Sequence, residues 1–341
     1  MLDAEIPGKW ACARRAYIRY LETLMRARLE LWSGACALAL AAGCTSSPRE
    51  LPACVRAPDV PSSRDSAIVV AAGDLVDCAG GAQERTAALA ESIHPDAVLA
   101  LGDLVYPNAT IDEYLDCYAP TWGRLRSVTH AVAGNHEYHT AHGGPFWAYF
   151  CGASGPPFRG YYSFDLGPWH AVVLNSNCGQ DADVPSYVPD DFGGCGEGSP
   201  QALWLAQDLA AHHGQCTIAM WHHPRFTSGS ADDGGRMRAL WAIAHANGVD
   251  LVLNGHAHLY NRFGKLDDDG QPSDSGMRSF VVGSGGHDLS KSVRSPAGLE
   301  ASNDSHNGVL RLDLQRESFA WQFLSSDDGT VLDSGEAPCA L

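Results

Sequence analysis

The sequence predicts an α/β fold, in which buried strands alternate with helices. Apolar runs of strand length, rich in β-branched residues, recur along the chain, and each ends abruptly in glycine or polar residues. Helix-like stretches lie between several of these runs. The chain has 341 residues and is 45% hydrophobic, so it can bury a large core.

Five runs share the form expected of strands buried on both faces. They are SAIVVAAGD (66–74), DAVLALGDLVY (96–106), SVTHAVAGNHE (127–137), CTIAMWHHP (216–224) and VDLVLNGHAH (249–258). Residues 160–177 predict two further strands around a Leu-Gly-Pro turn. Segments 278–288 and 307–329 are expected to continue a second sheet, with an antiparallel meander near the end.

Three helices are expected at 81–93, 199–212 and 235–248. The second opens with Ser199 as a plausible N-cap and with Pro200 at the first helical position. The third stops at Asn247 and Gly248, a typical helix C-terminus.

The N-terminal region resembles an export signal. Residues 32–47 form a short apolar run ending in small residues and a cysteine, too short for the roughly 20 residues of a spanning helix. LAAGC (40–44) resembles a bacterial lipobox, which makes Cys44 the expected lipid-anchored residue. Met25 is the expected true start, and a disordered or buried N-terminal helix is the alternative. We therefore predict a leader over 1–43, a Ser/Pro-rich tether over 44–66 and one folded domain over 67–341.

Charge and cysteine content restrict the partners and the compartment. The formal net charge of −17 argues against nucleic acid or an anionic membrane surface as a general partner. Of 11 cysteines, eight lie beyond the leader without CxxC spacing, which favours disulfides in an oxidising compartment over a zinc ribbon. Cys178 and Cys195 flank a Gly/Asp/Pro-rich loop that they could close.

Polar residues gather at the ends of the five runs, where functional groups of α/β sheets lie. They are Asp74, Asp103, Tyr106, Asn135, His136, Glu137, His222, His223, His256 and His258. Singly, each has a structural explanation, such as a turn, a helix cap or a core aromatic. His256 and His258 would face one point only if the backbone between them stays extended. The joint occurrence at five strand ends favours a metal site.

In order, GD (73–74), GDLVY (102–106), GNHE (134–137), AMWH (219–222) and GHAH (255–258) resemble the motifs of calcineurin-like metallophosphoesterases. The GD-x-x-Y form resembles the purple acid phosphatase branch of that family. The resemblance covers roughly residues 67–341. It implies a four-layer αββα sandwich with two mixed β-sheets flanked by helices.

The resemblance also implies two metal ions. Asp74, Tyr106 and His258 would hold one ion, Asn135, His222 and His256 would hold the other, and Asp103 would bridge them. A phenolate with carboxylates and one imidazole favours Fe³⁺, whereas an amide oxygen with two imidazoles suits Zn²⁺, Mn²⁺ or Fe²⁺. Two ions about 3.5–4 Å apart can generate a hydroxide that attacks phosphorus directly.

The remaining candidates would contact the substrate. His136 would serve as general acid or as a donor to the phosphoryl group, and Glu137 would orient His136 or a ligand. His222 is chosen over His223 as the ligand because the family places its ligand one residue before the one preceding proline. His223 and Arg225 would then contact phosphate oxygens, although Arg225 could equally lie on a surface loop.

Two departures from the branch are visible. Relatives often carry a further histidine in the substrate-facing loop, but FTSGSADDGGR (226–236) has none, which puts substrate binding in doubt. Val76 stands where the branch usually has glycine.

We expect an exported phosphomonoesterase of small phosphorylated substrates, monomeric and attached to the cell envelope through Cys44. A phosphodiesterase or nucleotide hydrolase with the same site is the alternative. A non-catalytic phosphate-binding lipoprotein is the alternative of another class. His287 follows a glycine run near a strand end; we expect it in a solvated loop, and the alternative is that it reaches the site.

Overall fold

The computed structural model describes residues 51–54, 56–178, 194–232 and 235–339. A compact unit starts at Ala53 and continues to the end of the chain. The leader, the lipobox and Met25 lie outside the described residues. The domain start at residue 67 stays a prediction; Val60, in the expected tether, is buried and forms a bridge with Leu166.

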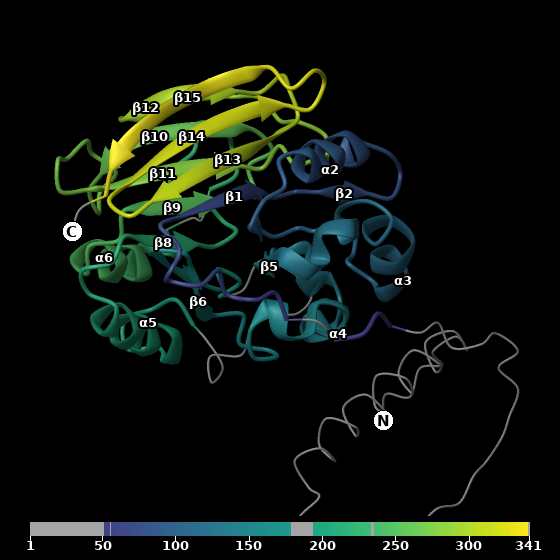
Figure 1. The fold of residues 1–341 in the computed structure, drawn as a ribbon, viewed down its shortest axis with the longest axis horizontal. Coiled ribbons are helices and arrows are strands. Elements are labelled where there is room, and N and C mark those ends of the chain that lie inside the picture. Colours follow the sequence, from purple (N-terminus) through teal and green to yellow (C-terminus); the bar gives the residue numbers. More distant parts are fainter. Residues whose placement is uncertain (1–50, 55, 179–193, 233–234, 340–341) are drawn as a thin grey trace, which may run out of the picture. The chain divides into compact units, whose positions relative to one another are not determined.

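Two mixed sheets form the centre of this unit (Figure 1). The six-stranded sheet has the order β15 (Val331–Pro338), β14 (Ser318–Ser325), β13 (Gly308–Gln315), β1 (Ser66–Ala72), β3 (Ala97–Ala100) and β5 (Thr129–Ala131). The seven-stranded sheet has the order β12 (Leu299–Asn303), β10 (Tyr260–Leu266), β11 (Met277–Val282), β9 (Leu251–Asn254), β8 (Thr217–Met220), β7 (Trp169–Val173) and β6 (Tyr162–Leu166). A short parallel pair, β2 (Val76–Asp77) and β4 (Val105–Tyr106), completes the strands of the described residues.

The direction of each strand follows from its connection. Strands joined through helices are parallel, as in β1–β3–β5 and β7–β8–β9, and β11 is also parallel to β9, to which strand β10 connects it. Strands joined by short turns are antiparallel, including β6 with β7 and β13–β14–β15. Segments 278–288 and 307–329 do not continue one sheet as expected, because β13 pairs with β1 whereas β11 pairs with β9.

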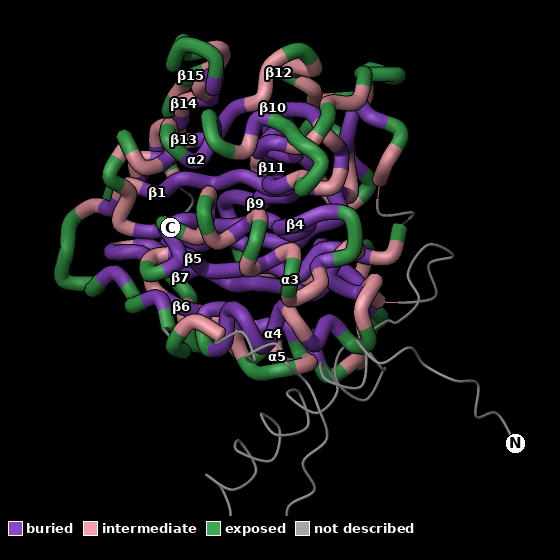
Figure 2. Tube along the Cα trace, turned by 90° about the vertical axis from the view of Figure 1, so that its right-hand side faces the viewer, coloured by how far each residue is buried: buried purple, intermediate pink, exposed green. Residues whose placement is uncertain are grey.

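Alternating side chains define the layers. In β9, Leu251 and Leu253 point into a core shared by both sheets, whereas Val252 joins a second core beneath α5 (Pro200–Ala211) and α6 (Arg238–Ala246). On the six-stranded side, α2 (Gln83–Ser92) packs near β13. Figure 2 shows the central strands buried and the connecting loops exposed. The predicted α/β class and layered sandwich are confirmed.

Shorter helices build the segment between β4 and β6. They are α3 (Ile111–Glu113), α4 (Gly144–Phe150), a π-helical turn at Tyr114–Tyr118 and 3₁₀ turns at Trp122–Val128, His136–His139, Ala141–Gly143 and Cys151–Ser154. Ser199 caps α5 as predicted, accepting from the amide of Ala202 at 3.2 Å. None of the described helices is long and apolar enough to cross a bilayer.

Candidate metal centre

One cluster collects the polar side chains that follow five strands. The loops after β1, β3, β5, β8 and β9 bring together all seven side chains expected to bind metal. Three of these strands belong to the six-stranded sheet and two to the seven-stranded sheet, so both sheets contribute to the cluster.

The phenol of Tyr106 occupies the middle of one half of the cluster. Its Oη lies 2.7 Å from Asp74 Oδ1, 3.1 Å from Asp103 Oδ2 and 3.2 Å from His258 Nε2. His258 Nε2 is also 3.2 Å from Asp74 Oδ1. Four potential ligand atoms therefore converge on one small volume.

His222 occupies the equivalent place in the other half. Its Nε2 lies 3.2 Å from Asn135 Oδ1 and 3.2 Å from Asp103 Oδ2. Asp103, His222 and His256 each offer one potential ligand atom, and these three atoms lie within 4.8 Å of one another. Asp103 Oδ2 thus contacts both halves, the arrangement expected of a bridging carboxylate.

Backbone conformation directs three of these side chains. Asp74, Asp103 and His256 have φ of 58°, 50° and 66°, in the left-handed region that L-residues rarely adopt. The extended conformation between His256 and His258 is therefore absent: β9 ends at Asn254, His256 turns toward His222, and His258 turns toward Asp74.

The motif glycines allow the loops to approach one another. A Cβ on Gly102 would lie 2.5 Å from His222 Nδ1, and one on Gly134 would lie 2.2 Å from Asp103 Oδ1. Any side chain at these two positions would displace residues of the cluster, so glycine is required directly before Asp103 and directly before Asn135.

Glu137 organises the loop that carries Asp103. Its buried carboxylate accepts from the amides of Asp103, Leu104 and Gly134 at 2.9, 2.9 and 2.7 Å, and from Tyr114 Oη at 3.0 Å. Burial, with the nearby Asp103 charge, raises the pKa of Glu137 to about 7. Of the two roles expected, these contacts support orientation of a ligand.

Backbone carbonyls determine which imidazole nitrogen faces the cluster. Nδ1 of His222 lies 2.8 Å from the carbonyl of Leu101, and Nδ1 of His258 lies 2.9 Å from that of Asp288. A carbonyl can only accept, so each Nδ1 donates to it, which leaves Nε2 as the ring nitrogen that faces the cluster. This is the orientation that metal-binding histidines adopt.

Opposing electrostatic effects act on the two histidines of the second half. Burial disfavours the charged ring of His222, but the Asp103 and Asp74 carboxylates and the Leu101 carbonyl together outweigh burial and raise the pKa of His222 to about 9. Burial, reinforced by the charge of His222, lowers the pKa of His256 to about 4.

The two carboxylates of the cluster are buried without a lysine or arginine partner among the described residues. Asp74 and Asp103 are 0% and 1% exposed. Among the described residues their ion-pair partners are histidines, with neither lysine nor arginine in contact. Buried carboxylates require a cation or a proton, and the converging lone pairs suit metal ions. The residues present therefore fit the dinuclear centre that the motifs imply.

His136 lies at the edge of the cluster, above Tyr106. The two ring centroids are 4.3 Å apart, and His136 Nδ1 lies 2.6 Å from the carbonyl of Pro107. Its Nε2 is 3.9 Å from Asp103 Oδ2, and the side chain is 23% exposed. This nitrogen can therefore reach a substrate bound beside Asp103.

His223 and Arg225 differ from His136 in their surroundings. His223 is buried behind His256, with ring centroids 4.3 Å apart, and its Nδ1 lies 2.8 Å from Ser176 Oγ. Burial, with the nearby His256, lowers the pKa of His223. Arg225 donates to the carbonyl of Asp268 at 2.8 Å and lies over the ring of Phe226.

An open cleft of about 610 Å³ adjoins the Tyr106 half of the cluster. Tyr106, His136 and His258 line its inner side, and Asp77, Pro107 and His287 contribute to the rest. His287 was expected in a solvated loop, but its ring lies 4.0 Å from that of Tyr106. Asp77 gave no sequence signal, whereas the glycine run before His287 could have indicated a close approach of the chain.

Three disulfides join described cysteines: Cys78–Cys117, Cys178–Cys195 and Cys216–Cys339. The suggested closure by Cys178 and Cys195 is confirmed. Of the eight cysteines expected to pair, Cys54 and Cys151 lie outside these three bonds.

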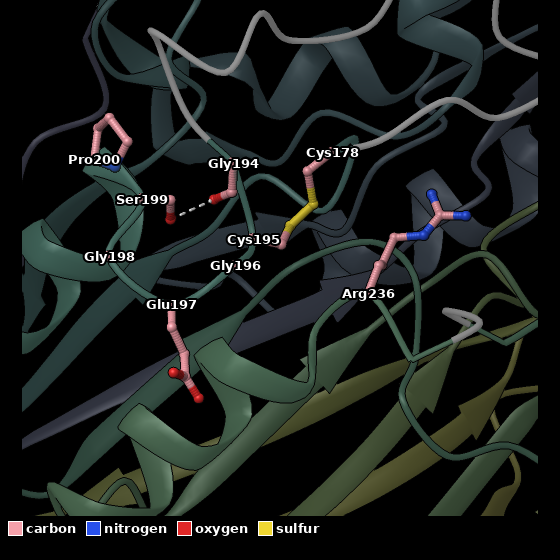
Figure 3. Close-up of a pocket in the computed structure, with 9 residues that line it drawn as sticks. All are labelled: Cys178, Gly194, Cys195, Gly196, Glu197, Gly198, Ser199, Pro200 and Arg236. Carbon is pink, nitrogen blue, oxygen red and sulfur yellow. Dashed lines mark hydrogen bonds between the residues drawn. A yellow bond between two sulfur atoms is a disulfide. The ribbon is translucent and has the colours of Figure 1, made fainter.

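A second cleft, of about 540 Å³, lies beside the Cys178–Cys195 disulfide (Figure 3). At its wall, Ser199 donates to the carbonyl of Gly194. Its described walls hold no group of metal-binding side chains.

Comparison with known proteins extends these observations. The sequence profile of the family "Calcineurin-like phosphoesterase" matches residues 67–260, and that of "Iron/zinc purple acid phosphatase-like protein C" matches residues 276–334. The chain is 28% identical over 266 residues to purple acid phosphatase 15 of Arabidopsis thaliana, covering 67% of this chain and 46% of that protein. It is 29% identical over 276 residues to phosphoenolpyruvate phosphatase of Allium cepa, covering 68% and 52%. The chain thus spans about half the length of these relatives.

Solved structures show the same fold. Purple acid phosphatase PPD1 from yellow lupin, Lupinus luteus, superposes with a TM-score of 0.69 at 18% identity, covering 82% of this chain and 55% of that one. The structure titled "Structure of PhoD" superposes with a TM-score of 0.55 at 15% identity, covering 84% and 70%.

Proposed function

Because the chain belongs to the calcineurin-like phosphoesterase family, in its purple acid phosphatase-like branch, we propose that it hydrolyses phosphate monoesters with two metal ions. One observation carries the proposal. Two fully buried carboxylates, Asp74 and Asp103, face a phenol and imidazole lone pairs, with no lysine or arginine among the described residues to balance them.

The ligand assignment is part of the proposal. Asp74, Tyr106 and His258 would hold one ion, and their hard phenolate and carboxylate oxygens suit Fe³⁺. Asn135, His222 and His256 would hold the other ion, and an amide oxygen with two imidazoles suits Zn²⁺, Mn²⁺ or Fe²⁺. The contacts of Asp103 Oδ2 with both Tyr106 Oη and His222 Nε2 support a bridging role.

Bound ions would supply Lewis acidity that activates water for attack at phosphorus. The chain's own residues orient and protonate. His136 Nδ1 donates to the carbonyl of Pro107, which directs Nε2 toward the substrate. That nitrogen donates to the phosphoryl group or protonates the leaving oxygen. His223, buried with its Nδ1 beside Ser176, supports His256 from behind, and contact of His223 and Arg225 with phosphate oxygens stays part of the proposal.

The monoester assignment takes further support from the relatives named for phosphatases, one of them for phosphoenolpyruvate. Phosphodiester hydrolysis by the same centre is the second candidate. It is favoured by the absence of histidine from residues 226–236.

The test combines metal analysis with a substrate panel. Protein loaded with iron and zinc should contain about two ions per chain and should hydrolyse p-nitrophenyl phosphate and phosphoenolpyruvate faster than bis-p-nitrophenyl phosphate. Asp103→Asn should lose both metal and activity, whereas the exposed Asp65→Asn should retain both. A preference for the diester would replace the monoester assignment, and a metal-free, inactive wild type would refute the centre.

We also propose export and lipid attachment at Cys44, from LAAGC (40–44). The three disulfides support an oxidising compartment. Cys44→Ser should release the protein from membranes of a bacterial host, and unchanged membrane attachment would exclude the anchor.

A further inference from the structure

The cleft beside the centre lies where the alcohol of a bound monoester would extend. Tyr106 and His258 belong both to the cluster and to the cleft wall, which His136 also lines, so a phosphoryl group bound at the cluster can extend its ester substituent into this volume. Size alone, about 610 Å³, sets little restriction on that substituent. The charges on the walls therefore decide which alcohols fit well.

Asp77 places one carboxylate on the outer wall. It is the last residue of β2 and pairs directly with Tyr106 of β4 across the parallel ladder. Its Oδ1 accepts from the amide of Ala79 at 2.8 Å, and its carbonyl accepts from Gln83 Nε2 at 3.0 Å. The Cys78–Cys117 disulfide follows immediately in the chain. The carboxylate is thus held at a fixed place by its neighbours.

His287 contacts Asp77 on the wall of the cleft. Its amide donates to the carbonyl of Asp74 at 3.0 Å, and Asn307 donates to its carbonyl at 3.0 Å. The ring packs on Tyr106 and directs Nε2 to within 3.4 Å of Asp77 Oδ2. Both members of the pair retain 21% side-chain exposure, so a ligand in the cleft can reach them.

The basic side chains on the described wall of this cleft are the imidazoles of His136, His258 and His287. Among the described residues that line the cleft, none is lysine or arginine. A second anionic group on a substrate would meet the Asp77 carboxylate with no lysine or arginine on this wall to bind it, whereas an ammonium group would find an acceptor in Asp77.

We propose that Asp77, positioned by His287, selects phosphate monoesters whose alcohol carries an ammonium group and disfavours those whose alcohol carries a carboxylate. This inference rests on the proposed monoesterase function and specifies its substrate class.

Two substrates of similar size test the selection: O-phosphoethanolamine, with an ammonium group, and 2-phosphoglycolate, with a carboxylate. The measured quantity is the ratio of the kcat/KM values for the two esters. Comparing this ratio between a variant and the wild type cancels the differing reactivity of the two esters. Asp77→Asn should lower the ratio by about tenfold, the size expected for a partly solvated charge pair within one cleft. Asp65→Asn, an equal loss of charge at an exposed site at the opposite end of β1, should leave the ratio unchanged.

A second variant guards against misfolding. Ala79→Lys adds a cation at an exposed position of the cleft wall and should also lower the ratio. Binding of the non-hydrolysable 2-aminoethylphosphonate and phosphonoacetate, measured by calorimetry, should shift in the same direction in both variants. An unchanged ratio together with unchanged phosphonate binding in both variants would overturn the selection by Asp77. Failure of the wild type to hydrolyse ethyl phosphate or either test ester would instead overturn the monoesterase assignment.

Discussion

Replacement of Glu137 by glutamine should loosen the Asp103 loop. The carboxylate accepts four hydrogen bonds: Oε2 from Asp103 and Gly134 amides, and Oε1 from the Leu104 amide and Tyr114 Oη. Glutamine replaces one oxygen with an NH₂ group, which then faces donors. The Tyr114 hydroxyl can rotate to accept, but one backbone amide stays buried without an acceptor.

A buried unsatisfied amide costs about 1–3 kcal/mol, and loss of a bond to a charged acceptor costs about 1.5–3 kcal/mol. The two costs are not additive here, because the unsatisfied amide is also the group that loses the charged acceptor. Glu137→Gln should therefore lower the free energy of unfolding by about 3 kcal/mol. Urea unfolding at pH 8 of protein treated with a chelator measures this change apart from metal binding. Zinc affinity of the folded variant should fall as well, because Asp103 loses its alignment.

Glu317→Gln is the matched control, since Glu317 is exposed in the turn between β13 and β14. It should change the free energy of unfolding by less than about 0.5 kcal/mol. A Glu137→Gln protein that is as stable as this control and binds zinc as tightly as the wild type would refute the positioning role.

Three further outcomes are expected. Tyr106→Phe should abolish any visible phenolate-to-iron absorption of the iron-loaded protein; a retained band would exclude Tyr106 as the ligand. Asn261→Ala removes side-chain hydrogen bonds to the amide and hydroxyl of Ser228, at 2.8 and 2.9 Å. It should lower the free energy of unfolding by about 2–3 kcal/mol and speed hydrogen exchange over residues 226–232. Unchanged exchange in this segment would contradict the expected role of Asn261. Burial alone would raise the pKa of Asp208, but hydrogen bonds from His170 and Ser163, with the charges of His170 and His212, together outweigh burial and lower it. The charged form of Asp208 therefore stabilises the fold above about pH 4, and this stabilisation is lost as the pH falls below that value. In Asp208→Asn, the free energy of unfolding should fall less steeply over the same pH range. A urea-unfolding profile between about pH 2.5 and 5 that matches the wild type would contradict this role of Asp208.

Local patterns were sufficient to predict the strands that carry the cluster. Near-continuous apolar runs identify β1, β3, β5, β8 and β9 because strands buried on both faces need apolar residues at every position. The polar residues after them then share one edge, which brought all seven expected ligand side chains into the same cluster.

Other parts depend on contacts distant in sequence. The divergence of His256 and His258 follows from a left-handed residue after β9, which a period-two pattern does not encode. Asp77 and His287 lie 210 positions apart (287 − 77) and meet only because β2 pairs with β4 and the loop after β11 returns to Asp74. Asn261 follows the GHAH motif, and its side chain joins residues 227–228 to β10 through hydrogen bonds that its sequence neighbours do not indicate.

Asp74, Asp103 and His256 adopt the mirror-image backbone region, at a cost of about 1 kcal/mol or more for each L-residue. Glycine would relieve that cost at every one of the three positions. A laboratory selection for thermal stability alone, carried out without metal, should therefore enrich glycine there and erase the centre. These positions are where the chain gives up stability to retain chemistry.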